Sequence, residues 1–76
     1  MVLAVAPKNA GVFRVEVFDV TGRRVAVLRD APLVPGMHRI GWAGQSSSGG
    51  RVAAGTYFVR VVGPGFHTTR KLVLVK

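Results

Sequence analysis

The chain has no cysteine and only three acidic residues among its 76. Without cysteine it can form neither a disulfide framework nor a thiolate metal site, so packing alone must stabilise the fold. Its longest apolar run, Val2–Ala6, is far shorter than the ~20 residues that cross a bilayer, and no basic region precedes it. The sequence therefore predicts neither a membrane span nor an export signal. Met1 followed at once by this run fits a domain excised from a longer protein.

Because acidic residues are few, the chain has a strongly positive net charge. Eleven Lys and Arg give a formal net charge of +8, while 49% of the residues are hydrophobic and only 18% are charged. Disordered basic tails have low hydrophobicity, whereas this composition supplies enough apolar surface to offset the entropy cost of folding. Residues 1–76 are therefore expected to form one domain with one small core, a size that excludes most enzymes with enclosed active sites.

Helical periodicity is also missing. Short alternating segments rich in valine and aromatic residues recur between glycine and proline clusters, which indicates an all-β fold. The expected strands are Val2–Ala6, Val12–Val20, Arg23–Arg29, Met37–Trp42, Arg51–Ala53, Thr56–Val62 and Phe66–Lys76. About seven antiparallel strands at this spacing predict a small immunoglobulin-like, fibronectin III-like β-sandwich without a disulfide.

The connections carry their own signals. Asp19 is expected to cap a tight turn with its side chain, and Gly22 to adopt positive φ there. The change of phase between Val27 and Leu28 predicts a bulge or a strand end. The segment from Asp30 to Gly36 contains two prolines, so it is expected to be a connection and not part of a central strand.

Two more expectations concern the later part of the chain. Residues 43–50 hold three serines and three glycines, which predicts the most flexible loop. In the last strand, Leu72 and Leu74 alternate with Val73 and Val75, so both faces of that strand are expected to be partly covered.

Four segments occur in an order that resembles a known family: Val15–Val25, Pro35–Gly44, Ala54–Val61 and Thr69–Lys76. Together they resemble the immunoglobulin-like domain shared by flagellar hook-capping proteins and the C-terminal sorting domains of type IX secretion cargo. The resemblance covers almost the whole chain. The positions that match the structural motif of this superfamily are Asp19, Gly22, Gly36, Trp42, Gly55 and Tyr57.

The resemblance implies a non-catalytic sorting and attachment domain at the C-terminus of a secreted bacterial protein. Its partners would be the N-terminal passenger and the outer-membrane secretion machinery, and its location the periplasm in transit, then the cell surface or the medium. The terminal motif on which recognition would depend comprises Lys71, Leu72, Val73, Leu74, Val75 and Lys76. A structural assembly domain of the hook-cap type is an alternative within the same resemblance.

No catalytic constellation emerges from the residues. Acid–base catalysis needs a positioned pair of groups, and Asp19 is better explained as a turn cap. His38 and His67 fall on different strands without a third ligand, and the serine cluster has no neighbouring base. We therefore expect no enzymatic activity, metal or cofactor, and we expect Trp42 to lie in the core.

The exposed basic and aromatic residues leave a binding function open. Arg14, Arg60 and Arg70 occupy polar phases of three strands, and a stripe formed by them would make the domain an accessory binding module for anionic polysaccharide or nucleic acid. Nucleic acid is disfavoured because no recognition helix, paired aromatic motif or zinc module is present. Phe18 and Phe58 share the phase of charged positions, so these rings, together with Phe66, either dock a partner or cover the edges or the ends of the core.

Overall fold

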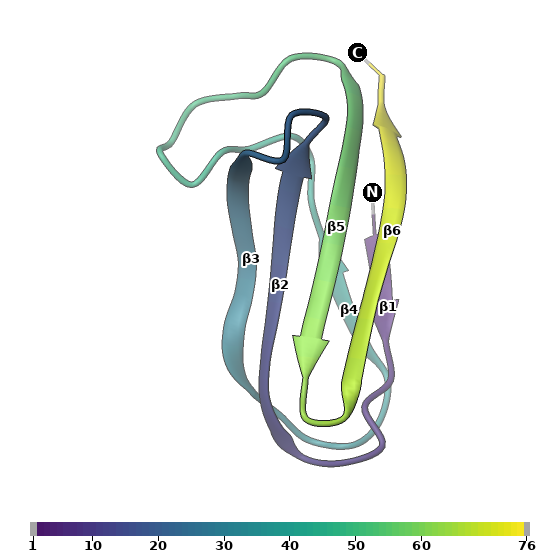
Figure 1. The fold of residues 1–76 in the computed structure, drawn as a ribbon. Coiled ribbons are helices and arrows are strands. Elements are labelled where there is room, and N and C mark those ends of the chain that lie inside the picture. Colours follow the sequence, from purple (N-terminus) through teal and green to yellow (C-terminus); the bar gives the residue numbers. More distant parts are fainter. Residues whose placement is uncertain (1, 76) are drawn as a thin grey trace.

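The structure, a computed structural model, describes residues 2–75, and this part of the chain forms six β-strands and no helix (Figure 1). The strands are β1 (Val2–Val5), β2 (Gly11–Asp19), β3 (Arg24–Leu33), β4 (His38–Gly41), β5 (Gly55–Gly63) and β6 (Phe66–Leu74). β1 and β4 form a two-stranded antiparallel sheet, and the other strands form a four-stranded antiparallel sheet in the order β3-β2-β5-β6. This arrangement confirms the predicted all-β sandwich. No helix in residues 2–75 is long and apolar enough to cross a membrane.

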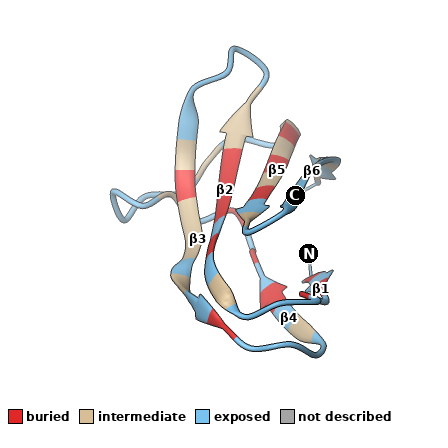
Figure 2. Ribbon diagram, turned by 60° about the horizontal axis from the view of Figure 1, so that its bottom comes forward, coloured by how far each residue is buried: buried red, intermediate tan, exposed pale blue. Residues whose placement is uncertain are grey.

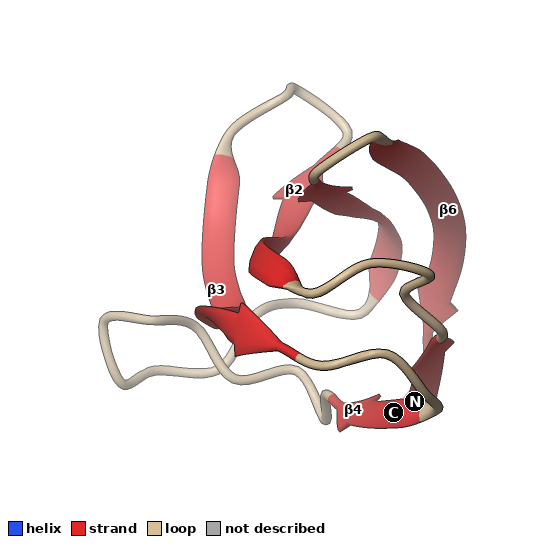
Figure 3. Ribbon diagram, turned by 90° about the horizontal axis from the view of Figure 1, so that it is seen from below, coloured by secondary structure: helices blue, strands red, loops and turns tan. Residues whose placement is uncertain are grey.

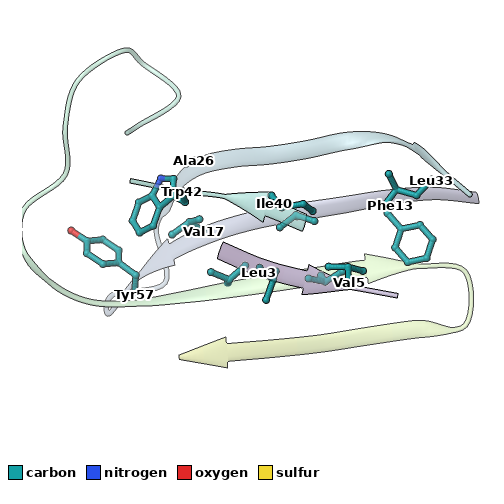
Figure 4. Close-up of a cluster of buried hydrophobic side chains, with 12 residues drawn as sticks. Leu3, Val5, Phe13, Val17, Ala26, Leu33, Ile40, Trp42 and Tyr57 are labelled. Atoms are coloured by element: carbon teal, nitrogen blue, oxygen red, sulfur yellow. The ribbon is translucent and has the colours of Figure 1, made fainter. Parts of the chain in front are cut away.

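The core lies between the two sheets, which face each other as two layers in Figure 3. Alternation places Val15 and Val17 of β2 and Val59 of β5 on the inner face, where each has 0% exposure. Side chains of β1 and β4 close the core from the other layer, as the labelled residues Leu3 and Ile40 show in Figure 4. Buried positions alternate with exposed ones along β1 and with intermediate ones along most of β5, whereas β2 has three consecutive buried residues, Val15 to Val17 (Figure 2).

The two prolines after Asp30 do not both lie in a connection. β3 continues through Pro32 to Leu33, so the expectation that residues 30–36 form only a linking segment is wrong for its first half. β3 is an outer strand of its sheet and pairs only with β2, and an outer strand can hold a proline because one side of it needs no backbone donor. The connection to β4 therefore begins at Val34.

The predicted bulge is present. Val15 pairs with Arg29 and Glu16 pairs with Val27, so Leu28 is an extra residue on β3 between them. A second shift follows after the Val17–Ala26 pair, because Phe18 pairs with Arg24 and Val25 is skipped. Two bulges in one strand increase its twist and bend it around the core.

The expected strand Arg51–Ala53 forms only one isolated bridge, between Arg51 and Gln45. The preceding serine-rich segment is a loop that hydrogen-bonds internally and to β3. Ser47 accepts a hydrogen bond from the Val27 amide through Oγ at 2.9 Å and donates its own amide to the Val25 carbonyl at 3.1 Å. Ser47 thereby covers part of the free edge of β3, which would otherwise offer unpaired backbone groups.

The end of the sandwich near the β5–β6 hairpin is closed by aromatic packing. The Phe13 ring lies against Gly63, where any Cβ atom would clash with it. The Phe66 ring lies 6.2 Å from that of Phe13, and Phe66 keeps 38% exposure. Of the two roles considered for Phe66, this contact supports covering the end of the core.

β6 is the outer strand on the other side of the four-stranded sheet and pairs only with β5. Leu72 and Leu74 are half-buried against the core, whereas Val73 and Val75 are 61% and 81% exposed. The expectation that both faces of this strand are covered is therefore wrong for the valine face. The four-stranded sheet has no third layer behind it, so that face meets solvent.

Candidate functional site

The side of the four-stranded sheet that points away from β1 and β4, here called the outer face, carries the candidate residues Arg14, Phe18, Phe58, Arg60 and Lys71. Strand register arranges them in rows that run from β3 through β2 and β5 to β6. The rows are Arg24, Phe18, Phe58 and Lys71; Val27, Glu16, Arg60 and Thr69; and Asp30, Arg14, Val62 and His67. Residues directly opposite on neighbouring strands have their Cβ atoms about 5 Å apart, so each row is a set of contacting side chains.

Glu16 is the centre of this face. Glu16 is only 3% exposed, and three arginines from three strands surround its carboxylate. Arg24 donates from Nη1 to Oε2 at 3.0 Å, and Arg60 donates from Nη2 to Oε1 at 3.2 Å. The Arg14 Nε lies 3.8 Å from Oε2 and, at the same distance, from the Asp30 carboxylate.

The surroundings of Glu16 determine its ionisation. Burial alone would raise the pKa of the carboxyl, but the hydrogen bonds from Arg24 and Arg60 and the charge of Arg14 outweigh it and hold the pKa below its ordinary value. Glu16 is therefore an anion at neutral pH. Sequence reasoning missed this role. The available signal was an acidic residue in the middle of an alternating strand, between the valines Val15 and Val17.

The predicted arginine stripe is not formed. Arg14 and Arg60 share the outer face and both approach Glu16. Arg70 pairs with Val59, a core residue, so Arg70 belongs to the opposite phase and lies at the open edge of the sandwich beside β1. The alignment expected for these three residues is wrong, because the pairing of β6 with β5 places Arg70 on the inner face and its neighbours Thr69 and Lys71 on the outer face.

Phe18 and Phe58 pair directly across β2 and β5 on the outer face. Both are partly buried, and the guanidinium carbon of Arg60 lies 4.7 Å from the centroid of the Phe18 ring, a cation–π distance. A hollow of about 350 Å³ adjoins the pair and is also lined by Asp19, Val20, Gly22, Arg60 and Thr69. Of the two roles considered for these rings, their position excludes closing the ends of the core.

The turn after β2 has the predicted form. The Asp19 Oδ1 accepts hydrogen bonds from the Thr21 amide at 2.9 Å, the Thr21 hydroxyl at 2.6 Å and the Arg23 amide at 3.0 Å. Gly22 has φ 87°, as the turn requires. These hydrogen bonds lower the pKa of Asp19, and the bond from the Thr21 hydroxyl has the largest effect. Asp19 is thus a turn cap.

Trp42 and Tyr57 meet at the other end of the core. Their rings are 5.4 Å apart and nearly perpendicular, and both residues are buried, which confirms the core position predicted for Trp42. Trp42 donates from Nε1 to the Gln45 carbonyl, and the Tyr57 hydroxyl donates to the Ala53 carbonyl four residues upstream. Each polar group therefore has a backbone partner, as buried aromatic residues require. The remaining motif glycines, Gly36 and Gly55, precede β4 and begin β5.

The other candidates are not brought together. His38 lies on β4, with Nε2 2.7 Å from the Val34 carbonyl, and His67 lies on β6 in the other sheet. Within residues 2–75 no three His, Cys, Asp or Glu residues gather closely enough to hold a metal ion. The serines at 46–48 hydrogen-bond within their own loop and to β3.

The predicted recognition motif occupies the outer strand. Lys71 to Leu74 lie in β6 and Val75 follows it, whereas Lys76 lies outside the described residues. Lys71 points to the outer face opposite Phe58, and Leu72 and Leu74 point inward. Since β6 pairs on one side only, its second edge is open along the described strand.

Comparison with protein families identifies the fold. A family model described as the FlgD Ig-like domain matches residues 2–64, which span β1 to β5 and so include both sheets. The chain belongs to this family. Comparisons with curated proteins and with solved structures give no match.

The FlgD Ig-like match supports the hook-capping half of the predicted resemblance. The type IX sorting half stays a prediction, because the matched region ends at residue 64 and does not include β6. The roles assigned to residues 71–76 thus depend on the resemblance alone.

Proposed function

We propose that this FlgD Ig-like domain is a non-catalytic structural assembly module of the hook-cap type. The observation that carries the proposal is the family match over residues 2–64, which covers β1 to β5 and so part of both sheets. A sandwich with a fully buried valine core is a rigid support, and it can present a side-chain pattern on its outer face to a neighbouring subunit. The module would act outside the inner membrane as part of a longer protein.

The sorting function is the alternative, in which β6 is the recognition element for outer-membrane secretion machinery. Its physical support is the open edge of β6, since strand addition at a free edge is a common mode of recognition. The two functions make different demands on the chain. Assembly needs the outer surface of the folded domain, whereas sorting needs the terminal residues from Lys71 onward.

A deletion series in the natural parent protein tests the proposal. One variant lacks the whole module, a second lacks only residues 71–76, and the parent protein is followed by cell fractionation and by sedimentation of its assemblies. An assembly module predicts that the first variant is still exported but no longer assembles. Export of the parent protein blocked by either deletion would overturn the proposal in favour of sorting, and unchanged export and assembly in both variants would overturn both functions.

A further inference from the structure

The two-stranded sheet covers only part of the four-stranded sheet. On β5 the inward side chains of residues 57, 59 and 61 are all buried. On β6 the inward side chains that pair with them are only half-buried or exposed: Thr68, Arg70 and Leu72. β4 contacts β3, and β1 is the strand of the smaller sheet that lies beside β6. The smaller layer therefore ends before it covers β6.

A groove of about 400 Å³ lies between β1 and β6. Its apolar walls include Leu3 and Val5 of β1, Val61 of β5 and Phe66 of β6. β1 pairs only with β4 and β6 only with β5, so each has a second edge without a strand partner. Figure 1 shows β1 and β6 on the same side of the molecule, with no strand of residues 2–75 beyond either. Free edges of this kind offer backbone N–H and C=O groups to another extended segment.

The chain closes the opposite side of the sandwich by itself. There Ser47 reaches the free edge of β3 and hydrogen-bonds to the backbone of Val25 and Val27. Within the described residues no loop hydrogen-bonds in this way to β1 or β6. An occupant of the groove must therefore come from outside these residues.

Arg70 supplies the charge of the groove. No carboxylate of residues 2–75 lies within 4 Å of an Arg70 nitrogen. Glu16 and Asp30 lie on the outer face, and Asp19 caps the turn after β2. The other ionisable side chain in the lining is that of His67, which adds no negative charge. The described chain thus leaves the positive charge of this groove without an acidic partner.

The strand edges, the apolar walls and the charge together select the occupant. They require an extended backbone, apolar side chains at alternate positions and a carboxylate. A sulfated polysaccharide could pair with Arg70, but it would leave the strand edges and the apolar walls uncovered. A second copy carries the same net charge of +8, and its strands β1, β4 and β6 contain no acidic residue. Its β3 does contain Asp30, but Ser47 covers part of the free edge of that strand.

We propose that the groove between β1 and β6 binds an extended segment of another protein, which adds to β1 as a third strand of the smaller layer. Apolar side chains of the added strand face the half-buried residues of β6, and a carboxylate on the same face pairs with Arg70. This inference rests on the proposed function in one respect, that the module acts by holding a partner. It goes beyond that function by placing this partner at the open side of the sandwich and by giving the chemistry of the bound segment.

The test uses the whole 76-residue chain, labelled with nitrogen-15, and a synthetic peptide of about nine residues. Valine alternates with threonine in this peptide, and one glutamate replaces the central valine. Amide chemical shifts give the affinity and the location of binding, and amide hydrogen exchange reports new backbone hydrogen bonds. Three control peptides have glutamine for the glutamate, a shuffled order without alternation, or methylated backbone nitrogens that cannot donate to a strand. A heparin oligosaccharide, and dilution of the chain alone, represent the other occupants.

A pair of charge variants separates the groove from the general charge of the chain. Arg70→Glu is compared with Arg51→Glu, which makes the same change at an exposed arginine in the loop on the β3 side. A fourth control peptide, with lysine for the glutamate, is titrated against the original chain and both variants. The thermal midpoint of each variant shows whether it has remained folded.

The expected result is saturable binding of the glutamate peptide, with shifts at β1 and at residues 66–70 and slower exchange of amides in β1. Arg70→Glu should weaken this binding roughly tenfold, and Arg51→Glu by less than about twofold. The lysine peptide should bind the Arg70→Glu chain more tightly than the original chain. The shuffled and methylated peptides should bind at least tenfold more weakly than the glutamate peptide.

Several outcomes would overturn the proposal. They are no binding of the glutamate peptide, equal weakening by the two arginine variants, and an unchanged affinity of the shuffled or methylated peptide. Tighter binding of heparin at the same residues, or shifts there that disappear when the chain alone is diluted, would assign the groove to a polyanion or to a second copy. If Arg70→Glu unfolds the chain, the peptide series on the original chain still decides the proposal.

The outcome is separable from that of the proposed function. Peptide binding is measured on the isolated chain, and assembly is measured on the parent protein. Loss of assembly on deletion of the module, combined with no peptide binding, would remove this inference and keep the proposed function. Peptide binding that depends on Arg70, combined with unchanged assembly, would do the reverse.

Discussion

Arg60 on β5 holds Glu16 on β2 across 44 residues of sequence, with 3.2 Å between Nη2 and Oε1. The same guanidinium lies over the Phe18 ring, so one side chain joins the buried anion to the Phe18–Phe58 pair on the outer face. The position of Arg60 thus depends on Glu16, and the shape of the hollow beside these rings depends on Arg60.

Glu16→Ala should lower the free energy of unfolding by about 1–3 kcal/mol, because three arginines lose their shared acceptor beside the core. We expect the lower part of this range, because the arginine side chains are 43–48% exposed and water screens their charges. Urea unfolding at neutral pH measures the effect. Asp30→Ala is the matched control. The Asp30 side chain is 54% exposed, so this substitution should lower the free energy of unfolding by less than about 0.5 kcal/mol. Equal losses in the two variants would contradict the buried role of Glu16.

Stability should fall in acid. The folded-state pKa values of Glu16 and Asp19 are both below their ordinary values, so each carboxylate contributes stability above its unfolded-state pKa and loses it as the pH falls through the folded-state pKa. The window therefore begins near pH 4, where free carboxyls titrate, and extends below it. Thermal midpoints from neutral pH downward measure this slope. Glu16→Gln should flatten the curve, since the amide does not titrate, and a slope equal to that of the original chain would count against the assignment.

Alternation within single segments predicted the strand Thr56–Val62, and it accounts for the core there, since Tyr57, Val59 and Val61 fall on one face of β5 and all three are buried. It could not predict which strand stands at an edge. For that reason Pro32 was assigned to a connection, and Val73 and Val75 to a covered face. Edge position results from pairing between distant strands, which periodicity within one segment does not report.

The functional surface was predicted only in part. The predicted roles of Asp19 and Gly22 are confirmed because a turn depends on neighbouring residues. The core position predicted for Trp42 is confirmed because it follows from the alternation within one strand. The Glu16 cluster and the Phe18–Phe58 pair depend on the register between strands, which the sequence does not state. Arg70 shows the consequence: a shift of one residue moved it to the opposite face of the sheet.

Gly63→Ala should destabilise the domain by about 1–3 kcal/mol, because a methyl group there would enter the space of the Phe13 ring. Phe13 is 1% exposed and has little freedom to move away. Gly50→Ala is the control. A methyl group at Gly50 meets only the Ser46 hydroxyl at 3.8 Å, an ordinary contact, so the change should be close to neutral. Thermal unfolding of both variants checks the difference, and an equal effect would mean that Phe13 can repack.

Tyr57→Phe should lower the free energy of unfolding by about 0.5–1.5 kcal/mol, because the hydrogen bond from the hydroxyl to the Ala53 carbonyl is lost while the ring remains. The edge contact with Trp42 is kept, so the emission of this single tryptophan should be unchanged in the folded state. Tyr57→Leu removes the aromatic contact as well and should cost about a further 0.5–1.5 kcal/mol. Urea unfolding followed by Trp42 fluorescence measures both steps. If the phenylalanine and leucine variants were equally stable, the ring contact would contribute nothing and the hydroxyl alone would account for the role of Tyr57 at this end of the core.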